Sequence, residues 1–152
     1  MCEPRKIRLT QKGYTLLEAL VAVIIIGILV SIAAPIYSTA VEQARLDSAA
    51  GNLKTIWSAQ RAYWLKFHTF ASNLAVLETE DLVSVSLAQT QMSPDARYVY
   101  YIDFAGADSF TASAIRSHSN VWQGTIQIDQ LGRLTGGIVK MDGSTLSPQT
   151  LE

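Results

Sequence analysis

The chain has 152 residues, of which 49% are hydrophobic and 16% are charged, and its formal net charge is −1. This length suits a single domain, since domains usually run to about 100–200 residues. The composition excludes a disordered chain, which needs low hydrophobicity and high charge. The single cysteine, Cys2, excludes a framework of disulfides within the chain. The lack of a basic excess argues against a nucleic-acid-binding face.

The apolar excess is concentrated in residues 14–37, where 19 of 24 residues are apolar and only Glu18 is charged. Residues 19–37 carry no charge at all. A helix of about 20 apolar residues crosses the hydrocarbon core of a bilayer, which is about 30 Å thick. Residues 1–13 have a net charge of +3, and positive residues before an apolar span stay in the cytoplasm. The sequence therefore predicts a single membrane-spanning segment with a cytoplasmic N-terminus.

Two plain interpretations fit this span. An ordinary secretory signal would be cleaved after the small-x-small residues 31–33, leaving a soluble domain that begins near Ala34. This apolar core is longer than the usual stretch of about 7–15 residues, however, and it has Glu18 near its start. A plain membrane anchor explains the span but explains neither Gly13 nor Glu18.

A specific string opens the apolar run: Lys12-Gly13-Tyr14-Thr15-Leu16-Leu17-Glu18. It resembles the class III signal of type IV pilins and of the pseudopilins of type II secretion. The resemblance implies that a prepilin peptidase cuts between Gly13 and Tyr14 and then methylates the new amino terminus of Tyr14. The family most often has phenylalanine at that position. Pro35, followed by an isoleucine and a tyrosine, resembles the family's exit from the apolar segment.

Glu18 places a carboxylate inside the apolar stretch, where a charge costs about 2.5–3.5 kcal/mol on insertion scales unless it reaches the headgroups. Residues 13–44 contain no lysine or arginine to pair with it. Cleavage would create a cationic partner, the new α-amino group. The resemblance implies that Glu18 of one subunit pairs with the amine of Tyr14 on a neighbour during assembly. It places Thr15 at the same assembly site.

Gly27 and Pro35 bracket the C-terminal part of the apolar segment. Glycine costs about 1 kcal/mol relative to alanine in a helix, and proline removes a backbone hydrogen bond, although membrane helices often tolerate both. In the resembled family, the stretch between these positions is frequently unwound in the assembled filament. We therefore predict a helix-to-extended transition over residues 29–34 in a filament.

After residue 37, apolar residues recur at three- and four-residue steps, which predicts an amphipathic continuation of the same helix to about residue 68. The aromatic stripe of Trp57, Tyr63, Trp64 and Phe67 is expected to lie in the core. Residues 69–96 are expected to connect this helix to the rest of the chain. Ser72 is expected to cap a short helix there.

The last third of the chain predicts antiparallel strands. Residues 98–104, 110–114, 125–129 and 133–139 are β-prone or alternate between apolar and polar side chains. Residues 110–115 and 124–132 also resemble strands of small Gram-negative pilins and pseudopilins. The predicted fold class is α+β, with a long N-terminal helix packed on an antiparallel sheet of about four strands, as in the pilin fold.

Catalytic motifs do not occur in the sequence. It contains no Gly-rich phosphate loop, CxxC pair or HExxH string, and its two histidines lie far apart. Asp103, Asp108 and the Asp142-Gly143 turn are candidate calcium ligands, but turn chemistry explains the Asp-Gly pair more simply. We therefore expect a protein that is not an enzyme and has no cofactor, no metal ion and no nucleic-acid partner.

These observations predict four segments: a removed cytoplasmic leader (1–13), a transmembrane and assembly helix (14–37), the amphipathic half of that helix (38–68) and a head with its connecting loop (69–152). The predicted function is a structural subunit of a type IV pilus-like filament, held in the inner membrane as a prepilin before it joins a filament in the periplasm or at the cell surface. Its expected partners are further subunits, a prepilin peptidase, an inner-membrane assembly platform and the lipid bilayer. The alternative is a pseudopilin of a type II secretion system, and the second alternative is a secreted soluble domain with an ordinary signal peptide.

Overall fold

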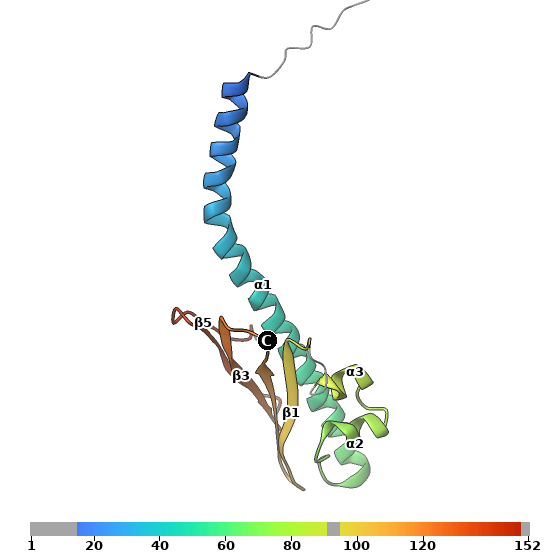
Figure 1. Cartoon of the computed structure of the whole chain (residues 1–152). Helices are drawn as coiled ribbons and strands as arrows, with labels where there is room; N and C mark the ends of the chain where they lie inside the picture. Colours follow the sequence, from blue (N-terminus) through green and yellow to red (C-terminus); the bar gives the residue numbers. More distant parts are fainter. Residues whose placement is uncertain (1–14, 91–94, 150–152) are drawn as a thin grey trace, which may run out of the picture. The chain divides into compact units, whose positions relative to one another are not determined.

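The structure is a computed structural model that describes residues 15–90 and 95–149. One long helix, α1 (Leu16–Phe67), is followed by two short helices and an antiparallel sheet (Figure 1). Contacts within the chain divide it into two compact units, with the boundary between Thr39 and Ala40. The apolar segment (residues 15–39) and the head, which from here on includes the second half of α1 (residues 40–149), are therefore described one after the other.

The apolar segment of α1 is a helix whose side chains are exposed. Residues 16–26 contain neither glycine nor proline, and alanine, leucine, isoleucine and valine dominate them, so nothing interrupts the helical hydrogen bonds. The segment is long and apolar enough to cross a membrane, and none of its most apolar 18-residue window is buried within the chain. Because so large an apolar surface is unfavourable in water, it needs lipid or other protein chains to cover it.

In the head, α1 packs on the sheet through a single buried stripe. The stripe residues recur at three- and four-residue steps, which places them on one face of the helix. Three of them are alanines, whose small side chains leave room for the rings and branched side chains of the sheet. The buried residues of α1 are Glu42, Leu46, Ala49, Ala50, Leu53, Ile56, Ala59 and Gln60.

Two short helices, α2 (Leu74–Thr79) and α3 (Val85–Ala88), follow α1. Asn73 begins α2, because its side chain accepts a hydrogen bond from the backbone N–H of Val76 at 3.0 Å. The predicted cap, Ser72, is therefore wrong by one residue. The start of this segment is joined to α1 by the buried amide of Gln60. That amide donates to the carbonyl of Ala71 and accepts from its N–H, both at 2.8 Å.

The sheet has five strands that follow one another in chain order, each antiparallel to the next. The strands are β1 (Tyr98–Ala105), β2 (Phe110–Arg116), β3 (Trp122–Asp129), β4 (Leu134–Lys140) and β5 (Thr145–Leu146). Short turns join successive strands, as antiparallel neighbours allow. This order makes every strand contact its sequence neighbour.

Alternation along the strands sends one set of side chains into the core. Ala112 and Ala114 of β2 pair with Ile128 and Ile126 of β3, and all four are buried. After β3, the carboxylate of Asp129 accepts hydrogen bonds from two backbone N–H groups of the following turn, at 2.9 and 3.0 Å. Such an Asx-type turn explains why the chain reverses at this point.

The α+β fold predicted from the sequence is confirmed, with two differences. The sheet has a fifth strand, β5, whose two residues are too few to show an alternating pattern. The aromatic stripe is not simply core: Trp57 and Tyr63 are half-buried and pack against the core, whereas Trp64 and Phe67 are 36% and 41% exposed. The small and branched residues of the buried stripe occupy the centre of the hydrophobic core. The larger aromatic rings therefore lie at the margin of the core.

Gly124 lies where β3 and β4 approach each other too closely for a side chain. Its φ is +146°, and an added Cβ would lie 2.3 Å from the carbonyl oxygen of Gly137. Only glycine combines this backbone conformation with this contact.

We predict that Gly124→Ala lowers the free energy of unfolding of the head by about 2–4 kcal/mol, from backbone strain and a clash with backbone atoms. Gly143→Ala is the matched control, since Gly143 also has a positive φ (+89°) but an added Cβ there would meet nothing within 4 Å. Its cost should be about 1–2 kcal/mol. Denaturant unfolding of the chain in neutral detergent measures both, and equal losses would contradict the clash.

Candidate functional site

The N-terminal end of α1 is organised by Thr15 and Glu18. The hydroxyl oxygen of Thr15 accepts a hydrogen bond from the backbone N–H of Glu18 at 3.2 Å, and the carbonyl of Thr15 accepts from Ala19. Thr15 is thus the N-cap, and Glu18 occupies the third helical position, the spacing of a capping box. A carboxylate in the first turn also interacts favourably with the helix dipole. The predicted processing residues Gly13 and Tyr14 lie outside the described residues.

Glu18 is the only charged residue of the apolar segment, and within the described residues its carboxylate forms no ion pair. Leu16, Leu17 and the other large apolar side chains around it are exposed. The structure therefore places Thr15 and Glu18 one turn apart on the same helix end. A single chain offers them no cationic partner among the residues described.

Gly27 and Pro35 both lie inside α1, which is continuous through residues 29–34 in the single chain. Pro35 has no N–H, so the carbonyl of Ser31, four residues earlier, lacks its usual backbone donor. The hydroxyls of Ser38 and Thr39 donate to the carbonyl of Pro35 at 2.8 and 3.1 Å. An added Cβ at Gly27 would meet nothing within 4 Å, so packing within the chain does not require a glycine there.

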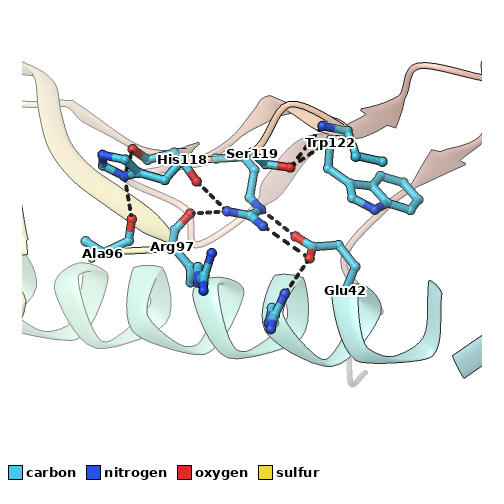
Figure 2. A network of polar contacts seen from close by, with 10 residues as sticks. Glu42, Ala96, Arg97, His118, Ser119 and Trp122 are labelled. Atoms are coloured by element: carbon cyan, nitrogen blue, oxygen red, sulfur yellow. Dashed lines mark hydrogen bonds and ion pairs between the residues drawn. The ribbon is translucent and has the colours of Figure 1, made fainter. Parts of the chain in front are cut away.

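The head contains a buried ion pair between α1 and β2, which Figure 2 shows. Arg116 donates from Nε to one oxygen of Glu42 at 2.5 Å and from Nη2 to the other at 3.3 Å. Both side chains are only 3% exposed. Arg45, one turn further along α1, donates to the same carboxylate at 3.0 Å from a side chain that is 43% exposed. Two arginines therefore share one glutamate.

The remaining donors of Arg116 bind backbone carbonyls at the end of the sheet. Its Nη1 donates to the carbonyl of Arg97 at 3.0 Å and to the carbonyl of Ser117. The guanidinium carbon lies 5.5 Å from the centre of the Tyr98 ring, a cation–π contact. Glu42 thus joins α1 to the start of β1 and the end of β2 through a single guanidinium group.

Tyr98 is the one residue of this network left incompletely satisfied. Its side chain is buried, and its hydroxyl has no hydrogen-bond partner among the described residues. Burial raises the pKa of Tyr98 well above its ordinary value, and the negative charge of Glu42 adds to the rise while Arg116 opposes it. The hydroxyl therefore stays neutral beside the ion pair.

This network was not predicted from the sequence, although one signal of it was present. Glu42 and Gln60 are polar residues at helical spacing on the same stripe as the apolar core residues of α1. A polar residue on an apolar stripe needs a buried partner. The identity of that partner, 74 residues further along the chain, could not be read from the pattern.

Two of the three candidate calcium ligands, Asp103 and Asp142, are engaged in other contacts. Asp142 pairs with Lys140 at 2.7 Å and accepts from the N–H of Ser144 at 2.9 Å, and these contacts lower the pKa of its carboxyl. Asp103 accepts from the hydroxyl of Ser113 at 2.9 Å. Across residues 15–90 and 95–149, no group of three or more metal-ligating side chains gathers.

Comparison with known proteins assigns the N-terminal segment. A family model described as the prokaryotic N-terminal methylation motif matches residues 8–34. No curated protein matches the chain. The chain therefore carries a type IV pilin-like class III signal, joined to an α+β pilin-like fold. The pilin-type family to which this signal is similar consists of structural subunits. The apolar helix together with the motif fits a membrane-anchored precursor.

We predict that Glu42→Gln lowers the free energy of unfolding of the head by about 3–5 kcal/mol, because it leaves the buried charge of Arg116 without a counter-charge. Arg45→Gln is the matched control, since it removes an exposed partner of the same carboxylate and should cost at most about 1 kcal/mol.

A double variant, Glu42→Leu with Arg116→Met, should recover most of this loss, since apolar residues can replace a buried pair. Denaturant unfolding of the three proteins tests the assignment. Equal losses for Glu42→Gln and Arg45→Gln would show that the buried pair has no special role.

Proposed function

We propose that this protein is the structural subunit of a type IV pilus-like filament. It is made as a prepilin, cleaved after Gly13, N-methylated at Tyr14 and polymerised through the apolar segment of α1. The methylation motif over residues 8–34 supports the processing steps. We further propose that the cleaved and methylated chain then polymerises into a filament, in which it functions.

The single observation that carries this proposal is the exposed apolar segment joined to an ordinarily packed head. The large apolar side chains of residues 16–37 are exposed, whereas the head buries its apolar residues in a core of its own. Lipid covers the segment while the precursor is in the membrane. In a filament, the same segments of neighbouring subunits cover one another, so extraction from lipid does not expose them to water.

Glu18 supplies the polar contact of that assembly. An unpaired carboxylate at membrane depth is unfavourable, and the described part of the chain offers Glu18 no cation. Removal of the leader creates an α-amino group at Tyr14, which stays cationic after methylation. We assign Glu18 of one subunit to the amine of a neighbour's Tyr14. Thr15 supports this contact, because its hydroxyl caps the N–H of Glu18 and so orders the first turn that carries the carboxylate.

The segment boundaries and partners follow from the same proposal. Residues 1–13 are a cytoplasmic leader, residues 14–37 the transmembrane and assembly helix, residues 38–68 its amphipathic half, and residues 69–152 the connecting loop and head. The precursor spans the inner membrane once with its N-terminus in the cytoplasm. It meets a prepilin peptidase and an assembly platform there, and it enters the filament from the bilayer.

Residues 29–34 are the part of α1 that we propose to unwind on assembly, between Gly27 and Pro35. Glycine weakens the helix at one end of this stretch, and the missing N–H of Pro35 weakens it at the other. A cryo-electron microscopy map of the filament would test this. A continuous helix through Ser31 would contradict it.

Processing is tested by mass spectrometry of the mature protein from cells that contain a prepilin peptidase. We expect a chain that begins at Tyr14 and carries one N-terminal methyl group. Gly13→Val should leave the leader in place, because the peptidase no longer recognises the site. A mature chain beginning near Ala34 would instead identify an ordinary signal peptide and overturn the proposal.

Assembly is tested with Glu18→Gln and Glu18→Leu, measured as the amount of subunit in filaments sheared from cells relative to that in membranes. Both variants should be processed normally yet lose about tenfold or more of the filament fraction, since neither presents a charge to the amine. Glu78→Gln in the head, a residue without an ion pair in the described structure, is the control. Normal filaments from the Glu18 variants would disprove the pairing role.

The same preparation separates the two filament classes. Surface filaments would identify a pilus subunit. Loss of secreted enzymes when this chain is deleted, without filaments on the surface of the unmodified cell, would identify a pseudopilin of a type II secretion system.

A further inference from the structure

Positive charge gathers on one side of the head, between α1 and the start of β1. Arg116 and Arg45 both bind the carboxylate of Glu42, which uses both of its oxygens for them. Figure 2 shows the side chain of Arg97 pointing toward α1, and Arg97 lines the same groove as Arg45. The guanidinium of Arg97 has no ion pair or side-chain hydrogen bond among the described residues.

The three arginines and the single glutamate, Glu42, together leave a formal surplus of two positive charges. The surplus is unusual, because residues 38–152 contain 8 basic and 11 acidic residues and so carry a net charge of −3. Like charges held close together repel, and the repulsion is greater where protein replaces water. Asp95, two residues before Arg97, is exposed and is not among the described residues that line the groove. Residues 91–94 carry no charge, so they do not alter this balance.

A groove of about 260 Å³ lies at this position. Two of the arginines, Arg45 and Arg97, contribute to its wall, and Ser48 and Asn52 of α1 lie beside them. The hydroxyl of Ser48 has no hydrogen-bond partner in the described structure, so a donor is available next to the guanidinium groups. The buried Arg116 does not line the groove, but it donates a hydrogen bond to the backbone carbonyl of Arg97, which does.

We propose that this groove binds a phosphate group that carries two negative charges, as hydrogen phosphate or a phosphomonoester does near neutral pH. A phosphomonoester has a charge of about −1.5 to −2 at pH 7, which balances the surplus. A carboxylate or a phosphodiester has one negative charge and therefore balances only half of the surplus positive charge. Arginine also matches phosphate oxygens with paired N–H donors. This inference concerns the single chain and does not depend on filament assembly.

Phosphate binding is tested on the full chain in micelles of a neutral detergent, by calorimetric titration with inorganic phosphate against sodium chloride of equal ionic strength. We expect saturable binding that Arg97→Gln weakens by about tenfold, the loss typical of one charge-assisted hydrogen bond. Because the Arg97 side chain has no described partner within the protein, this substitution should leave the fold unchanged. The thermal unfolding midpoint without phosphate checks this.

Arg61→Gln is the matched control, since Arg61 lies on the same helix and has no ion pair in the described residues, but lines a different pocket. Its affinity for phosphate should equal that of the unmodified chain. Equal affinity of the Arg97→Gln variant, or a response no larger than that to sodium chloride, would overturn the proposal.

Three competition titrations, with glycerol phosphate, phosphatidylglycerol and acetate, identify the class of anion that the groove binds. Glycerol phosphate, a soluble monoester, should compete with inorganic phosphate, whereas phosphatidylglycerol added to the micelles, a diester, should compete at least tenfold more weakly. Competition by phosphatidylglycerol alone would identify a lipid headgroup and contradict the requirement for two charges. Equal competition by acetate would show a general anion site and contradict it as well.

Discussion

The buried ion pair of Glu42 and Arg116 is the interaction on which the head depends. Each side chain is 3% exposed, and either one alone would be a desolvated charge, which is strongly destabilising. The pair links α1 to β2, and Arg116 continues the link to the backbone of Arg97 before β1. Any other register of the helix on the sheet would separate these two buried charges, at a large cost in stability. The apolar stripe from Leu46 to Ile56 packs in the register that keeps them together.

The two glutamates of α1 meet the same physical problem in different ways. Glu42 is removed from water by the head and finds its counter-charge within the chain. Glu18 lies in the apolar segment, and the described chain provides it with no cation. The described part of the chain neither pairs this carboxylate nor covers the apolar surface around it. Both features indicate a contact with another molecule. This contrast connects the packing of the head to the assembly proposed for the apolar segment.

The composition is an average over unlike parts. The apolar excess belongs to residues 14–37, whereas the head has the usual division into a buried core and a charged surface. Several basic residues of the head pair with an acid, as Arg133 does with Asp129 and Lys140 with Asp142, whereas Lys54 and Arg61 have no ion pair among the described residues. Arg97 differs, because it adds a third arginine to a region with one glutamate. This local imbalance, rather than the net charge of the head, is what points to an anionic ligand.

The sequence by itself determined the features that depend on residues a few positions apart. These are the membrane-length apolar run, the processing string ending at Glu18, the long helix and the four alternating strands. A helix cap, a turn and an alternating strand each depend on residues within a short stretch of sequence, so the sequence alone predicts them. The cap of α2 was nevertheless placed at Ser72, one residue before Asn73. The two-residue strand β5 and the marginal position of Trp64 depend on what packs nearby, which no local pattern records. Only the tertiary structure decided that Glu42 meets Arg116 and that Arg45 and Arg97 line one groove, because these contacts join residues far apart in the chain through the register of a helix on a sheet.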